Sequence, residues 1–296
     1  MTVELLAPAK VKLGLEVIRK RDDGYHEIAT VFQTVSVFDR LRIGSSHADS
    51  VVITNRIEQI NENLVQRAFE AARETGIATG HWQIEIDKRI PLSAGLGGAS
   101  ADAAATLLAI AEADAAKMAE AALALGSDVP FLLKGGTALA RGRGELLDPL
   151  PGLSSCWFVL GTPALELERK TARLYGALDA RDFSDGGRIA CVADALHAGR
   201  IPRFDDLANT FSRPLIRLLP EMELVPHAFR AAGASFAALT GAGPTHYTIV
   251  PQLNEAISIA RKLAMNPPLT MRVLIARPAS TGTLMKQKPM VPGKAL

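Results

Sequence analysis

The chain has 296 residues, of which 48% are hydrophobic and 22% charged, and its formal net charge is +2. This length predicts roughly two domains with a buried core, and scattered basic residues with so small a net charge argue against nucleic acid as a partner. Cys156 and Cys191 are too few for a disulfide framework, and the absence of a signal pattern or an apolar run of ~20 residues predicts a cytoplasmic protein without a membrane anchor.

The N-terminal half mixes predicted strands and helices. Residues 5–17 and 28–37 are expected to be strands joined through an Asp22-Asp23-Gly24 turn. A helix is expected over 62–75, and apolar and polar residues alternate over 82–87 as in a half-buried strand. Two more helices are expected over 101–111, with Ser100 as the N-cap, and over 115–125.

The C-terminal half starts with a predicted strand over 157–160. Helices are expected over 217–224 and 225–232, a strand-turn-strand unit over 236–250 and a last strand over 271–276. These elements predict an α+β protein with a domain over 1–153, a second over 154–277 and a flexible tail over 278–296.

A glycine-rich segment, here called the phosphate loop, joins the strand over 82–87 to the helix over 101–111. Its glycines allow positive φ and close approach of a ligand, and free N–H groups at the start of a helix favour an anion. An ordinary glycine turn is the alternative. The loop lacks a Gly-Lys-Ser/Thr ending, which excludes the common NTPase motif. It consists of Pro91, Leu92, Ser93, Ala94, Gly95, Leu96, Gly97, Gly98, Ala99, Ser100 and Ala101.

Three segments resemble the motifs of the kinases that act on galactose, homoserine, mevalonate and phosphomevalonate (GHMP kinases). The phosphate loop is similar to their nucleotide loop. Gly126-Ser127-Asp128-Val129-Pro130 resembles their catalytic-aspartate segment, although Asp128 by itself would be a helix cap. Thr240-Gly241-Ala242-Gly243-Pro244 resembles their third motif, although by itself it would be a hairpin turn.

The segment Asp23-Gly24-Tyr25-His26 is similar to the signature of the 4-diphosphocytidyl-2-C-methyl-D-erythritol kinase family. The resemblance extends from Lys10 to about Ala276. It implies the two-domain GHMP kinase fold, with an N-terminal domain like ribosomal protein S5 domain 2, a C-terminal α+β domain and the active site in the cleft between them. The implied reaction moves the γ-phosphoryl group of ATP to the 2-hydroxyl of the cytidine diphosphate substrate, in non-mevalonate isoprenoid synthesis.

The resemblance also implies roles for individual residues. The phosphate loop would hold ATP, with Asn63 near adenine, although a helix cap is an equal interpretation of Asn63. Asp128 would orient the acceptor hydroxyl, and Lys10 beside it would stabilise charge, whereas an isolated strand lysine is normally a solvated surface charge. Mg²⁺ would accompany ATP with unknown protein ligands, Ser100 being one candidate.

The resemblance implies a substrate site with aromatic residues for the base. Tyr25 and Phe32 would stack on the pyrimidine, His26 would hydrogen-bond its edge and Tyr175 would be a second stacking residue. An aromatic core pair with a satisfied histidine is the alternative. Beside the phosphates the resemblance places the glycine turn of Thr240, Gly241, Ala242 and Gly243.

Lys12 departs from the family pattern, which has Asn two residues after the catalytic lysine. Lysine only donates hydrogen bonds and adds a charge, so Lys12 would either reach a substrate phosphate or weaken contacts to the methylerythritol hydroxyls.

Other functions remain open at this point: another GHMP kinase acting on mevalonate, homoserine or a sugar, a non-catalytic nucleotide-binding regulator, or a structural protein. A monomer or weak homodimer is expected.

Overall fold

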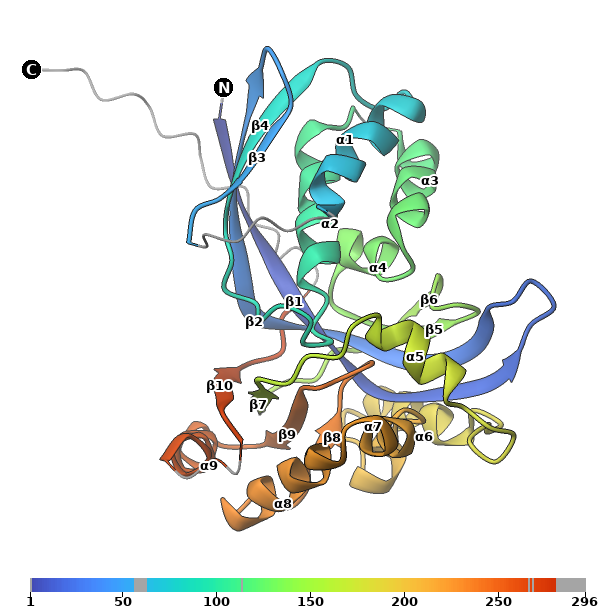
Figure 1. The fold of residues 1–296 in the computed structure, drawn as a ribbon, viewed down its shortest axis with the longest axis vertical. Coiled ribbons are helices and arrows are strands. Elements are labelled where there is room, and N and C mark those ends of the chain that lie inside the picture. Colours follow the sequence, from blue (N-terminus) through green and yellow to red (C-terminus); the bar gives the residue numbers. More distant parts are fainter. Residues whose placement is uncertain (1, 56–62, 113, 266, 268, 281–296) are drawn as a thin grey trace, which may run out of the picture.

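The computed structural model describes residues 2–55, 63–112, 114–265, 267 and 269–280, and within these residues the chain forms two sheets with helices packed against them (Figure 1). The α+β class predicted from the sequence is confirmed.

The first sheet is built around a long antiparallel hairpin. Its strands are β1 (Thr2–Lys20), β2 (His26–Ser46), β3 (Ser50–Ile53), β4 (His81–Asp87), β5 (Thr137–Arg141) and β6 (Leu146–Pro149). The strand order is β3-β4-β2-β5-β6, with β1 paired to β2, and only the β3–β4 pair is parallel. The first two strands are longer than the sequence predicts. Register shifts between Pro8 and Ala9 and between Lys12 and Leu15 interrupt the β1–β2 ladder.

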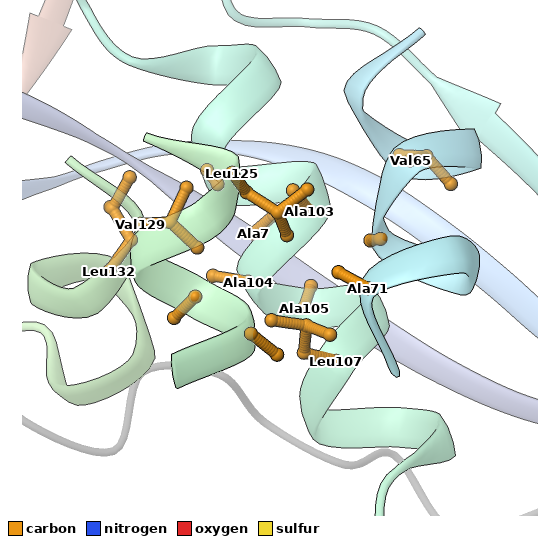
Figure 2. Packing of buried hydrophobic residues seen from close by; sticks show 14 of the residues in the cluster. Ala7, Val65, Ala71, Ala103, Ala104, Ala105, Leu107, Leu125, Val129 and Leu132 are labelled. Carbon is orange, nitrogen blue, oxygen red and sulfur yellow. The ribbon is translucent and has the colours of Figure 1, made fainter. Parts of the chain in front are cut away.

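Four helices lie on one side of this sheet (Figure 1): α1 (Leu64–Glu74), α2 (Gly98–Ile110), α3 (Ala115–Leu125) and α4 (Val129–Lys134). Helix α2 is central, and its alanines Ala103, Ala104 and Ala105 are fully buried between side chains of α1 and of α3 and α4 (Figure 2). Small side chains allow neighbours to approach α2 from several sides. The phosphate loop, which leads into α2, is therefore attached to a helix that is buried over most of its length.

The second sheet has the order β10-β7-β9-β8. Its strands are β7 (Trp157–Pro163), β8 (Ala238–Leu239), β9 (His246–Val250) and β10 (Met271–Ala276). The helices of this half are α5 (Lys170–Gly176), α6 (Gly187–His197), α7 (Ser212–Leu218), α8 (Leu224–Ala231) and α9 (Leu253–Met265), with 3₁₀ turns η1 (Phe204–Leu207) and η2 (Pro220–Glu223). No helix in the described ranges is long and apolar enough to cross a membrane.

The hairpin of β1 and β2 joins the two halves. Val11 and Leu13 of β1 share a buried cluster with Phe158 of β7 and Tyr247 of β9. The domain boundary proposed between residues 153 and 154 lies between β6 and β7. It stays a prediction, and one apolar cluster contains residues from both sides of it.

Two local predictions are wrong. Ser100 does not cap α2, because the helix already starts at Gly98 with Gly97 as the N-cap residue. The helix expected over 217–224 is two pieces, α7 and η2, since Pro220 cannot continue a helix that needs its N–H. The flexible tail expected over 278–296 stays a prediction: the Ala279 N–H donates to the Thr34 carbonyl at 2.8 Å, and 281–296 lie outside the described residues.

A buried charged cluster fixes both ends of the phosphate loop. Lys88, directly after β4, donates to Asp39 of β2 and, at 2.6 Å, to Asp102 of α2, and all three residues are buried. Asp39 also accepts from the Ile90 N–H at 2.8 Å. Burial raises the pKa of Asp102 to about 8, against the opposing charge of Lys88. The cluster thus ties the segment before the loop to the helix after it.

Replacing Lys88 by Met should lower the free energy of unfolding by about 3–5 kcal/mol, because Asp39 and Asp102 would be left buried without the cation that they share. Chemical denaturation measures this loss, and the exposed Lys117→Met provides the control, with an expected change within about 0.5 kcal/mol. Equal stability of both variants would show that the buried cluster does not hold the fold.

Candidate active site

Lys10 and Lys12 project from the same side of β1, because side chains two residues apart in a strand point the same way. Lys10 is 3% exposed, so it is not the solvated surface lysine that a strand position suggests by default. Its ammonium donates to the Gly95 carbonyl of the phosphate loop at 2.9 Å. The Lys12 backbone N–H donates to the Thr240 hydroxyl at 2.8 Å. The strand therefore contacts both glycine-rich segments.

Asp128 lies at the N-cap position of α4, but its side chain makes no capping hydrogen bond to the helix. Its carboxylate is 3.2 Å from the Lys10 ammonium and 3.8 Å from that of Lys12. Burial by itself would raise the pKa of Asp128, but the two lysines outweigh that effect and lower it. The carboxylate is thus an anion at neutral pH, held by two cations from β1.

The lysines also influence each other. Burial is the main cause that lowers the pKa of Lys12 to about 8; the Asp128 charge opposes the shift and the Lys10 charge adds to it. A group with this pKa is mostly charged at pH 7 and loses its proton in the mildly alkaline range.

The phosphate loop has positive φ at alternate residues: Ser93 (51°), Gly95 (78°) and Gly97 (73°). Positive φ alternating with other conformations is typical of backbone nests that bind anions. A Cβ on Gly97 would lie 2.8 Å from Lys10 Cε, and one on Gly95 would lie 2.7 Å from the Thr240 carbonyl oxygen. Positive φ was also expected at Gly98, but Gly98 is the first residue of α2 and is not among the positive-φ glycines. Because residues 95 and 97 have no side chain, β1 and the third motif can approach the phosphate loop closely.

The residues of the third motif pack against the loop. Asn209 donates to the carbonyls of Leu239 and Gly241 at 2.9 and 2.8 Å and holds the turn in place. Thr240 is fully buried, and its hydroxyl accepts from the backbone of Lys12, so its side chain supports the site from behind.

The expected aromatic residues come together except for Phe32. His26 stacks on Tyr175 with ring centroids 4.5 Å apart, and Tyr25 is 56% exposed. Phe32 is fully buried and stacks on Phe131 at 4.6 Å, so the expectation that it stacks on a base is wrong: its faces belong to the core under the two lysines. Burial, followed by the charge of Lys20, lowers the pKa of His26, which is therefore neutral at pH 7.

A cavity of about 510 Å³ brings the charged and aromatic groups together. Sequence reasoning missed several of its residues, including Arg143, whose guanidinium lies 4.5 Å from the centre of the Tyr25 ring. The repeated glycines around Arg143 signal a tight turn and could have drawn attention to it. The lining residues are Lys10, Lys12, Leu15, Gly24, Tyr25, His26, Ile28, Gly95, Gly97, Ser127, Asp128, Arg143, Thr171, Tyr175, Phe211, Gly241 and Ala242.

The other predicted ATP-binding residues named next are not among those that line this cavity. Pro91, Ala94, Leu96 and Ala101 are buried, whereas Leu92, Ser93 and Ala99 are exposed. Asn63 caps α1, accepting from the Val65 N–H at 3.0 Å. Its contact with adenine stays a prediction. Within the described residues no group of three or more His, Cys, Asp or Glu side chains is arranged to hold a metal ion.

The site combines a nest-like loop with an aspartate between two lysines. The model for GHMP kinase N-terminal domains matches residues 63–136, and the model for GHMP kinase C-terminal domains matches 192–267. A 4-diphosphocytidyl-2-C-methyl-D-erythritol kinase from Dehalococcoides mccartyi is 38% identical over 266 residues, covering 88% of this chain and 93% of the relative. The chain belongs to this family of GHMP kinases. As such it is an ATP-dependent small-molecule kinase.

Further comparisons agree with the family. The 4-diphosphocytidyl-2-C-methyl-D-erythritol kinase of Listeria monocytogenes is 32% identical over 269 residues, covering 86% of this chain and 90% of the relative. A crystal structure of a 4-(cytidine 5'-diphospho)-2C-methyl-D-erythritol kinase superposes with a TM-score of 0.75 at 34% identity, covering 92% of this chain and 98% of that one. Homoserine kinase from Cytophaga hutchinsonii, with a TM-score of 0.68 at 18% identity and coverage of 95% of each chain, shares the fold. The expected two-domain GHMP kinase fold is thus confirmed.

Gly97→Ala should lower kcat by about 100-fold, because the new Cβ would push the Lys10 stem away from Asp128. Steady-state kinetics measures the loss. Gly199→Ala is the matched control: its φ of +66° is equally unfavourable for alanine, but nothing lies within 4 Å of the new Cβ. If both variants keep the parent kcat, the contact between Gly97 and Lys10 does not position the lysine.

Proposed function

We propose that the chain transfers the γ-phosphoryl group of ATP to the 2-hydroxyl of 4-diphosphocytidyl-2-C-methyl-D-erythritol. The observation that carries this proposal is a single cavity lined by both charged and aromatic groups. Lys10, Lys12 and Asp128 line it next to the phosphate loop, and Tyr25 and His26, which also line it, offer a π-face and a neutral imidazole. These groups suit a nucleobase, whereas mevalonate, homoserine and sugars have no base for them to bind.

Asp128 is suited to orient the acceptor. Phosphoryl transfer depends on alignment and charge stabilisation more than on a strong base. The lowered pKa of Asp128 makes its carboxylate a weak base but a permanent hydrogen-bond acceptor for the substrate hydroxyl. Lys10, held by both Gly95 and Asp128, would stabilise negative charge on the moving phosphoryl group. Together they fix the acceptor opposite the phosphate loop.

The cytidine diphosphate would span the cavity. Its base would lie against Tyr25 and Tyr175, with the His26 imidazole both donating and accepting at the cytosine edge. Because His26 stacks on Tyr175, a base that uses this face of Tyr175 has to move the imidazole aside. Lys12, whose ammonium is 3.8 Å from the Asp128 carboxylate, would be the cation for the diphosphate.

Mg²⁺ is expected to enter with ATP. Magnesium usually keeps several waters and is bound through one or two protein groups together with substrate phosphates. The absence of a three-ligand cluster among the described residues is compatible with that arrangement, and Ser100 at the start of α2 stays a candidate ligand. We also expect the enzyme to act in the cytoplasm as a monomer or weak homodimer, without a nucleic-acid partner.

The direct test is incubation of the purified chain with ATP, Mg²⁺ and each candidate acceptor, followed by ³¹P NMR. A new phosphomonoester on the 2-hydroxyl of the cytidine diphosphate substrate is the expected product. Faster phosphorylation of mevalonate or homoserine would keep the kinase class and overturn the substrate. Binding of nucleotide without any transfer would favour the regulator.

Asp128→Asn should lower kcat by about 10²- to 10⁴-fold with little change in ATP affinity, because the acceptor loses its orienting carboxylate. Turnover assays and nucleotide titration separate the two effects. Asp114→Ala is the control for helix capping, since Asp114 accepts from two N–H groups at the start of α3. It should cost about 1 kcal/mol of stability and no activity. An Asp128→Asn enzyme with parental kcat would contradict the assigned role.

Lys12 should make binding of the diphosphate pH-dependent. Protonated Lys12 attracts the anion, so affinity for CDP should fall as pH rises through about 8, where Lys12 loses its proton. In Lys12→Asn, CDP should bind more weakly at pH 7 and the fall near pH 8 should shrink. Calorimetric titration from pH 6.5 to 9 measures both effects, with cytidine as the uncharged control ligand. An unchanged CDP profile would make the charge of Lys12 incidental.

A further inference from the structure

Lys170 connects the two glycine-rich segments of the site from a third direction. It is the first residue of α5. Its ammonium donates to the carbonyls of Ser93, in the phosphate loop, and Gly243, in the third motif. The same helix carries Thr171 and Tyr175, which line the cavity.

The charge of Lys170 is not neutralised by any carboxylate within ion-pair distance in the part of the chain that the structure describes. Asp128, the carboxylate of the site, is already paired with Lys10 and Lys12. Lys170 thus adds a third lysine beside the phosphate loop, and Lys10 and Lys12 already share the one aspartate. Burial, followed by the charge of Lys10, lowers the pKa of Lys170 to about 8. An anion bound at the phosphate loop would supply a negative charge for Lys170.

The position of Lys170 is suited to a phosphate. An ammonium has three donors, and the two carbonyls occupy two of them. Lys170 holds the carbonyl of Ser93, and Lys10 holds that of Gly95 two residues later. Both carbonyls belong to the loop whose alternating positive φ is typical of an anion-binding nest. The phosphate loop itself contains no lysine.

We propose that Lys170 is a phosphate-binding residue, whose ammonium contacts the phosphate chain of bound ATP and so supplies the cation that the loop lacks. The inference rests on the proposed kinase function and adds a nucleotide contact to it. A purely structural alternative is that Lys170 ties α5 to the loop. The two alternatives predict different changes in ligand affinity. If Lys170 contacts phosphate, its loss should weaken binding only of ligands that carry the ATP phosphates. If Lys170 only ties α5 to the loop, its loss should also displace Tyr175 and weaken binding of other ligands.

The test compares Lys170→Met with Lys170→Arg and with Arg173→Met, an exposed position of the same helix. Each folded variant is titrated with adenosine, with a non-hydrolysable ATP analogue and with CDP. In Lys170→Met the ATP analogue should bind about 10- to 100-fold more weakly, the range of one hydrogen bond to a charged group. Adenosine and CDP should bind as in the parent. Lys170→Arg should recover part of the loss, and Arg173→Met should show none.

Other outcomes overturn the inference. Unchanged affinity for the ATP analogue in Lys170→Met would remove the phosphate contact. Equal losses for adenosine, the analogue and CDP would show that Lys170 only positions α5 and the loop. Because these are binding measurements, they remain decisive if the chain phosphorylates none of the tested acceptors, the result that would refute the proposed function instead.

Discussion

The site depends on how the Lys10 ammonium is held. The Gly95 carbonyl and the Asp128 carboxylate bind it at 2.9 and 3.2 Å, and its carbon stem lies against Gly97. These contacts come from the phosphate loop and the start of α4, while Lys10 itself belongs to β1. A lysine that is 3% exposed is stable as a cation only where such partners offset the lost hydration. One buried charge therefore sets the relative positions of strand, loop and helix.

Sequence reasoning was most successful where the chemistry is local. The phosphate loop, the Asp128 segment and the glycine turn at 240–244 are contiguous, and the structure brings all three together around Lys10. It failed where contacts with other elements determine the environment of a residue. Phe32 occurs in a suitable segment, but Phe131 covers its face, and a single strand does not reveal which side the core takes. Ser100 is a good cap residue, but the helix starts earlier because Gly97 accommodates the left-handed N-cap.

Long-range contacts account for the residues that were missed. Lys170 and Ser93 are 77 positions apart, and nothing near Lys170 in sequence marks it as part of a phosphate site. The helix break at Pro220 could have been found, since proline is a local signal. The long β1 and β2 strands could not, because their outer ends are extended by cross-strand pairing with each other.

The cations of the site come from elements that are far apart in the sequence, so their arrangement depends on how these elements pack. In an NTPase loop that contains its own lysine, folding of the loop alone places the positive charge. Here Lys10 and Lys12 come from β1 and Lys170 from α5, and β1 is packed into the clusters of both halves. The charge around the phosphate loop is complete only when these halves are docked, so the packing of Val11 and Leu13 against Phe158 and Tyr247 supports the electrostatics of the site as well as its stability. Core substitutions at this junction would change the distances among the lysines and Asp128, and kinase activity is therefore coupled to packing well away from the reacting atoms.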